Sequence, residues 1–187
     1  MKVLKILHNK RSALVSGWID VILSTYHADA AVLFKNKTMR FANPVGETIA
    51  DGVEVLVDEF LKGEFTDKGY SALESIVKIR AVQDFTPSRA LAFVLLFKQI
   101  LREELGNNIS SAETAAEFLA LERQIDELTL RAFDQYVWSR ERVFEIRTRE
   151  VERKNHMLLR YVNKQMENQG GKPDPCEDKI ISLHDAR

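Results

Sequence analysis

The sequence predicts an all-α fold: a helical bundle with one long C-terminal helix and a flexible tail. Three observations support this prediction. Glycine and proline are scarce and lie between segments with helical apolar periodicity. No run of residues alternates between apolar and polar in the manner of a strand. From Ser111 to about Gln169 there is neither glycine nor proline, a stretch far longer than an ordinary globular helix.

Size and composition indicate a substantial core and no charge bias. The 187 residues fit one domain plus an extension, and 45% are apolar. The net charge of -1 gives no general attraction to nucleic acid or to anionic membranes. The only cysteine, Cys176, cannot form an internal disulfide. Because the N-terminus lacks a signal-peptide pattern and the longest apolar run, Ala90 to Phe97, is far below the about 20 residues of a membrane span, we expect a cytoplasmic protein.

The N-terminal half should begin with one helix over about residues 2–25. Its apolar face is Leu4, Leu7, Leu14, Trp18, Val21 and Ile22. The pattern over 26–42 is unclear, with a short helix possible at 30–34. Asn43 and Pro44 then mark a helix start, and Gly63 should close that helix. Its buried positions should be Val45, Ile49, Val53, Leu56 and Phe60.

Two further helices should follow without a long connection. Thr66-Asp67 can open the first, which should end near Asp84 and bury Tyr70, Leu73, Ile76 and Val77. Thr86 can cap the second, with Pro87 in its first turn and Gly106 as a left-handed cap. Because residues 90–97 are apolar on every side, this helix should be the buried centre of the fold, Leu95 included.

The long helix should open with a capping box, Ser110 as cap and Glu113 reaching back. Its first part should pack on the domain through Ala115, Phe118, Leu119, Leu121, Ile125 and Leu128. Its second part carries an apolar seam with a seven-residue spacing: Leu130, Val137, Phe144, Val151 and Leu158. A second, more basic seam runs beside it: Phe133, Arg140, Arg147, Lys154 and Tyr161. This is a coiled-coil pattern, and a solvated helix or two helices with a bend are the alternatives.

These patterns predict three segments. Residues 1–135 should form the domain, 136–168 a charged extended helix that contacts a partner, and 169–187 a flexible tail. A short docking motif at 180–183 is the alternative for the tail. The stretch 139–155 mixes both charge signs, whereas nucleic-acid binding favours a cleaner basic stripe, so we expect no nucleic-acid partner.

No pattern for catalysis, metal binding or cofactor binding is present. The chain lacks a phosphate-binding glycine loop and a paired-cysteine metal site, and its acidic pairs, Asp58-Glu59 and Glu103-Glu104, fit solvated helix faces. The histidines have no ligand spacing on a shared helix: His8, His27, His156 and His184. The acidic neighbours of Cys176 should disfavour its thiolate. We therefore expect a protein that is not an enzyme and carries no cofactor.

Arg80 is the unusual residue of the central region, because it lies among apolar residues directly before the predicted buried helix. A buried charge needs a partner. The simpler interpretation is an ion pair or a helix-end bond, with Asp84 four residues on as a candidate. The other is that Arg80 and Gln83 bind a carboxylate or the backbone of a partner protein.

Two short motifs carry a family resemblance. After Trp18 come Asn-Pro-Val-Gly at 43–46 and Arg-Ala-Val-Gln-Asp-Phe-Thr-Pro-Ser at 80–88, followed by an apolar helix. This order resembles the RsbRD amino-terminal sensory family over roughly residues 5–135. The resemblance implies a globin-like helical fold that lacks haem and dimerises. The absence of any histidine between His27 and His156 agrees, because a haem globin needs an axial ligand.

Relatives of this kind precede a STAS-type domain or a histidine kinase, whereas here only a charged helix and a short tail follow the resemblance. We therefore expect a homodimeric sensory or adaptor module whose output resides in a separate effector, such as a kinase or a STAS-type protein. One alternative is a small-ligand sensor with an apolar pocket near Trp18, Phe93 and Phe97. Another is an accessory protein of a redox complex.

Overall fold

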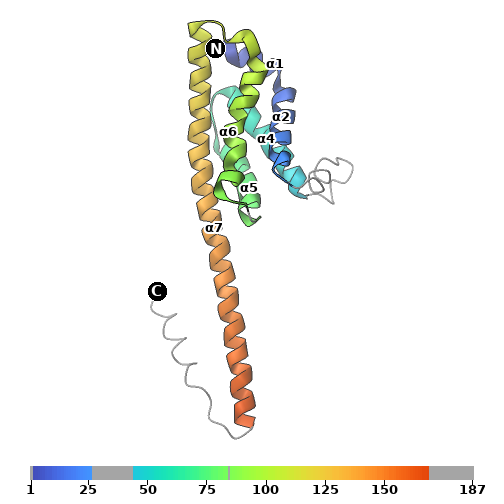
Figure 1. The fold of residues 1–187 in the computed structure, drawn as a ribbon, viewed down its shortest axis with the longest axis vertical. Helices are drawn as coiled ribbons and strands as arrows, with labels where there is room; N and C mark the ends of the chain where they lie inside the picture. The colour runs from blue at the N-terminus through green and yellow to red at the C-terminus, as the bar shows by residue number, and fades with distance from the viewer. Residues whose placement is uncertain (1, 27–43, 84, 169–187) are drawn as a thin grey trace. The chain divides into compact units, whose positions relative to one another are not determined.

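The computed structural model describes residues 2–26, 44–83 and 85–168, and in this part of the chain every regular element is a helix (Figure 1). The helices are α1 (Lys2–Asn9), α2 (Arg11–Ser24), α4 (Pro44–Lys62), α5 (Asp67–Val82), α6 (Pro87–Leu105), the short 3-10 helix η2 (Gly106–Asn108) and α7 (Ala112–Asn168). The predicted all-α fold with a long C-terminal helix is confirmed. The possible helix at 30–34 and the predicted tail at 169–187 lie outside the described residues.

The chain divides into two compact units, Met1–Arg140 and Glu141–Arg187. In the first unit, α1, α2, α4, α5, α6 and the first part of α7 pack around one core (Figure 1). The predicted apolar faces supply most of this core, which includes Leu14, Trp18, Val53, Phe60 and Ile76. In the second unit, the described residues are the remainder of α7.

The single helix predicted over 2–25 is wrong, because the chain breaks at Lys10. Lys10 leaves helical geometry (φ -108°, ψ 14°), and its backbone N–H donates to the carbonyl of Leu7 at 2.9 Å. Its side chain forms an ion pair with Glu104 at 3.1 Å. Leu7 on α1 and Leu14 on α2 are both buried in the same core, as the predicted apolar face required.

The prediction that α6 is buried on every side is also wrong. One side of α6 packs into the core through residues such as Phe93 and Phe97, whereas Leu95 is 47% exposed. Likewise, Phe118 and Leu121 of α7 pack on the domain as predicted, but Ala115 and Leu119 are exposed. An unbroken apolar run cannot reveal an exposed face, because it has no polar residues to mark one.

The helix ends largely follow the predicted capping chemistry. Thr86 accepts a bond from the backbone of Arg89 at 3.4 Å, and Gly63 and Gly106 adopt the positive φ that favours glycine (78° and 48°). The capping box of α7 lies one residue later than predicted. Ser111 Oγ accepts from the Thr114 backbone N–H at 3.2 Å, and Thr114 Oγ1 accepts from the Ser111 backbone N–H at 3.1 Å.

A buried carboxylate joins α4 to α5. Glu59 is only 2% exposed, so the prediction that the Asp58-Glu59 pair is a solvated face is wrong for Glu59. Its Oε2 accepts from the backbone N–H of Thr66 at 2.7 Å and from the Thr66 hydroxyl at 2.6 Å, and its Oε1 pairs with Lys62 at 3.0 Å. These bonds lower the pKa of Glu59 to about 2. Elsewhere along α4, a Cβ added to Gly52 would lie 2.9 Å from Ile76 Cδ1, so a larger residue there would require the Ile76 side chain on α5 to shift.

Replacement of Glu59 by glutamine should remove an acid-dependent part of the stability. Because the pKa of Glu59 is depressed from 4.5 to about 2 in the folded chain, its ionised form contributes stability above pH 4.5 that is lost as the pH falls toward 2. Urea midpoints of wild type and Glu59→Gln, measured from pH 6 to pH 3, should therefore converge as the pH falls. If the difference between the two urea midpoints stayed constant over this pH range, the role assigned to the ionised carboxylate would be wrong.

Candidate functional site

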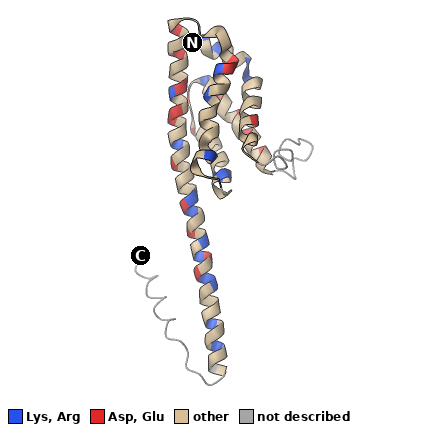
Figure 2. Ribbon diagram, in the orientation of Figure 1, with Lys and Arg blue, Asp and Glu red and all other residues tan. Residues whose placement is uncertain are grey.

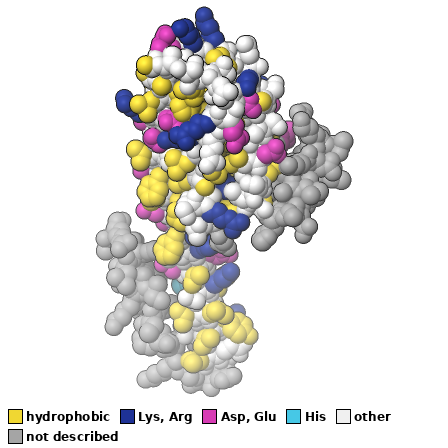
Figure 3. Space-filling model, turned by 45° about the horizontal axis from the view of Figure 1, so that its top comes forward, with side chains coloured by type: hydrophobic (Ala, Val, Ile, Leu, Met, Phe, Trp, Pro, Cys, Tyr) yellow, Lys and Arg dark blue, Asp and Glu magenta, His cyan; other side chains and the backbone are white. Residues whose placement is uncertain are grey.

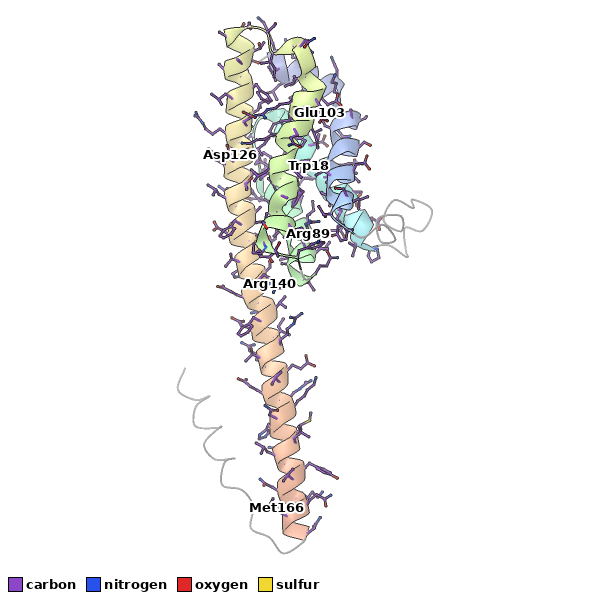
Figure 4. The ribbon with its side chains drawn as sticks, viewed as in Figure 1. Trp18, Arg89, Glu103, Asp126, Arg140 and Met166 are labelled. Atoms are coloured by element: carbon purple, nitrogen blue, oxygen red, sulfur yellow. The ribbon has the colours of Figure 1, made fainter. Side chains whose placement is uncertain are left out.

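The predicted pocket residues of α2 and α6 meet in the core. The rings of Trp18 and Phe97 stack with centroids 3.9 Å apart and an interplanar angle of 14°, and Phe60 meets Phe97 edge-on at 5.2 Å. The indole N–H of Trp18 donates to the backbone carbonyl of Phe93 at 2.8 Å. Figure 4 shows Trp18 in the interior of the first unit. These side chains contact one another, so a ligand at this place would have to displace them.

Arg80 is fully buried and bonds within its own chain. Its guanidinium donates to the carbonyls of Ala90 (2.7 Å) and Arg89 (2.9 Å) and to the hydroxyl of Thr25 (2.9 Å). Burial lowers the pKa of the Arg80 guanidinium. These contacts fit the simpler interpretation of Arg80, a hydrogen bond at a helix end. The other suggested partner, Asp84, lies outside the described residues. The Nη1 atom of Arg80 has no hydrogen-bond partner among the described residues.

Aromatic rings surround the Arg80 guanidinium. Its Cζ lies 4.7 Å from the ring centroid of Phe85, 5.4 Å from Tyr26 and 5.6 Å from Phe93. These distances are within reach of cation–π attraction, which is stronger where the cation is desolvated. Arg80 thus holds together the C-terminal ends of α2 and α5 and the first turn of α6.

The predicted site residue Gln83 lies next to Arg80. Its Oε1 accepts from the hydroxyl of Tyr26 at 2.8 Å, and burial raises the pKa of that phenol. Arg89 donates to the carbonyl of Thr25 at 2.7 Å. Sequence reasoning missed Thr25, Tyr26 and Arg89, because none of them stands in a recognisable pattern with Arg80. Only Arg89, three residues after Thr86 at the start of α6, could have drawn notice as a charge beside the junction.

Two ion pairs fix how α6 lies against α7. Lys98 pairs with Asp126 at 2.6 Å, and Arg102 pairs with Glu122. Moving four residues forward along α6 moves four residues back along α7, so the two helices run antiparallel, as Figure 1 shows. Figure 4 marks Asp126 on α7 beside α6.

An apolar patch is exposed along this helix pair. It consists of Leu95 on α6 and Leu130, Phe133 and Val137 on α7. Extending the register of the two ion pairs places Leu95 beside residue 129 of α7, and the other three follow within two helical turns. Leu130, a member of the predicted apolar seam, is 68% exposed. Figure 3 shows hydrophobic side chains exposed on the molecule. Contiguous exposed apolar residues commonly mark interaction surfaces.

A family model matches residues 12–151, and its description is "RsbT co-antagonist protein rsbRD N-terminal domain". The chain belongs to this family. The predicted resemblance is thereby confirmed, and the RsbRD N-terminal family is one of regulatory sensory domains in stress signalling. No curated protein matches the chain, and no solved structure matches it.

The motifs of this RsbRD domain have a structural place. Pro44 to Gly46 of the first motif form the first turn of α4, whereas Asn43 lies outside the described residues. The second motif runs from Arg80 at the end of α5 to the first turn of α6. The second motif therefore contains Arg80, whose guanidinium bonds to the first turn of α6, and also Thr86, which caps α6.

The RsbRD match ends within α7 at residue 151, and of the predicted apolar seam only Leu158 lies beyond it. Phe144, Val151 and Leu158 are all exposed in the second unit. Ionised side chains of both signs are interspersed along this part of α7 (Figure 2), and they include the pairs Lys154–Glu150 at 3.3 Å and Arg142–Glu145 at 3.7 Å.

The described parts of the RsbRD chain hold neither a cluster of metal ligands nor a helix suited to a membrane. There, no three His, Cys, Asp or Glu side chains gather in a way that could hold a metal ion. His8 is exposed and His156 half-buried, whereas His27, His184 and Cys176 lie outside the described residues. Across the same residues, no helix combines the length and apolar character needed to cross a membrane.

Proposed function

We propose that this RsbRD domain is a homodimeric, non-enzymatic sensory or adaptor module that acts through protein contacts. The exposed apolar residues of α7 carry this proposal, because a soluble monomer rarely leaves a long row of large apolar side chains in water. Leu130 and Val137 belong to the apolar patch of the first unit, and Phe144, Val151 and Leu158 repeat the same seven-residue spacing in the second.

The output would then reside in a separate cytoplasmic effector, of which a kinase or a STAS-type protein is the kind expected. Family membership supports a regulatory role of this sort. The ligand-pocket alternative has less support. Trp18, Phe93 and Phe97, the residues expected to line the pocket, pack against one another in the place where the ligand would bind.

Charged substitutions on the apolar seam should weaken self-association. Val137→Asp and Phe144→Asp would each place a carboxylate in the contact, and each should weaken the dimer at least about 30-fold, or about 2 kcal/mol. Native mass spectrometry of dilution series of the full chain would measure the change. Circular dichroism should confirm that the variants keep their helical content.

Val82→Asp is the matched control, since Val82 is an exposed valine on α5, outside the seam. This control should keep the mass of the wild-type protein. A wild-type chain that is monomeric at micromolar concentration, or seam variants that dimerise as well as Val82→Asp, would refute the proposal.

A further inference from the structure

The described helix of the second unit carries one mixed stripe. Phe144, Val151 and Leu158 recur every seven residues, and Phe144 is 71% exposed. Three residues after each of them comes Arg147, Lys154 or Tyr161, respectively. Residues three apart are neighbours on a helix, so these six side chains form a single stripe, in the arrangement of the two core positions of a coiled coil.

The two cations decide in which direction two copies of this stripe can pair. In a parallel dimer in register, each core position faces its own counterpart. Arg147 would then face Arg147 of the other copy, and Lys154 would face Lys154. Two layers of like charge, one on either side of the Val151 layer, would lie in the contact, and such pairs repel.

Antiparallel pairing removes both repulsive layers. If Val151 of one copy faces Lys154 of the other, then Arg147 faces Leu158 and Phe144 faces Tyr161, each pair occurring twice. The aliphatic stems of Arg147 and Lys154 can cover the leucine and the valine while their charged ends reach the rim. Aromatic pairs follow at both ends of this stripe. One heptad further out, the same register places Val137 of one copy opposite residue 168 of the other, so the contact extends to Val137.

Charge at the rim agrees with this register. Glu150 lies one residue before Val151, so Lys154 of the opposite copy would come next to it. Within one chain the same two residues already pair at 3.3 Å. The facing copies would therefore bring together a small network of two lysines and two glutamates, with no unpaired like charges at its centre.

We propose that the α7 segment of the second unit pairs antiparallel with the same segment of a second copy, about a two-fold axis between Val151 and Lys154. This is an isologous contact, in which the same surface serves both copies. The inference rests on the proposed function in requiring self-association, and it adds the direction and register of the contact. It also predicts that the C-terminal ends of the two helices point in opposite directions.

Disulfide trapping in the full chain tests the direction. In a Cys176→Ser background, Phe144→Cys and Tyr161→Cys are made in separate, differently tagged chains, purified alone or after co-expression, and oxidised. A disulfide needs Cα atoms about 4.4–6.8 Å apart. In the antiparallel pair the two copies of position 144 would lie roughly 25 Å apart along the axis, at about 1.5 Å per residue. Neither variant alone should cross-link, whereas the co-expressed pair should.

A spin label at Arg142→Cys in the same background gives a second reading that spares the stripe, since Arg142 lies outside it. The antiparallel arrangement predicts a label separation beyond about 30 Å, from roughly 21 residues of axial offset. A parallel pair would bring the labels to about 20 Å or less, the width of two packed helices.

The outcomes separate this inference from the proposed function. Cross-linking of Phe144→Cys alone, or a short label distance, overturns the antiparallel pairing and leaves self-association standing. A dimer that cross-links in no combination and gives neither label distance also overturns it, and places the contact elsewhere on the chain. A wild-type protein that is monomeric overturns both.

Discussion

Replacement of Trp18 by alanine should destabilise the first unit by about 3–5 kcal/mol, because the indole is fully buried and stacked on Phe97. The variant also loses the bond from the indole N–H to the carbonyl of Phe93. Chemical denaturation followed by circular dichroism would measure the change in the free energy of unfolding.

Leu95→Ala is the matched control on α6. Leu95 is half exposed, so its truncation should cost only about 1 kcal/mol, roughly half the burial energy of a leucine. A loss at Leu95 as large as that at Trp18 would show that the covered side of α6 has been assigned wrongly.

Replacement of Arg80 by alanine should be nearly as damaging, with an expected loss of about 3–5 kcal/mol. It removes three charge-assisted hydrogen bonds and leaves a cavity among the rings of Tyr26, Phe85 and Phe93. Thermal and urea unfolding of the variant would both report the loss.

Two further variants separate charge from packing at this site. Arg80→Met fills much of the space without a charge and should recover part of the stability, since a buried ion is costly to desolvate. Arg89→Ala, which removes an exposed guanidinium that donates to Thr25, should cost about 1 kcal/mol. Equal losses at Arg80 and Arg89 would contradict the special place of the buried residue.

Much of the fold follows from local sequence signals. The Thr86-Pro87 start of α6 and the glycines at 63 and 106 mark helix ends through backbone chemistry alone, and the structure has them there. The faces of α4 and α5 follow from apolar spacing. The break at Lys10 could not be foreseen, because no glycine or proline marks it in the sequence.

The candidate site was less accessible to sequence reasoning. Arg80 could be recognised as an unusual buried charge, but its acceptors on residues 25, 89 and 90 are mostly backbone atoms, which carry no sequence signature. Glu59 was missed for the related reason that its main partner is Thr66, in the turn that follows its helix. The exposed seam of α7 was visible because its spacing is regular and depends on no distant partner.

The connection between α4 and α5 has a consequence for the order of folding. Only a few residues separate these helices, and Glu59 joins them by bonds that span seven positions in the sequence. Closing so short a loop costs little entropy, so this hairpin can form before contacts that are distant in sequence. Trp18 and Phe93, by contrast, lie 75 positions apart. We therefore expect the α4–α5 hairpin to act as the folding nucleus. The packing of α2 onto α6 should form only after the folding transition state.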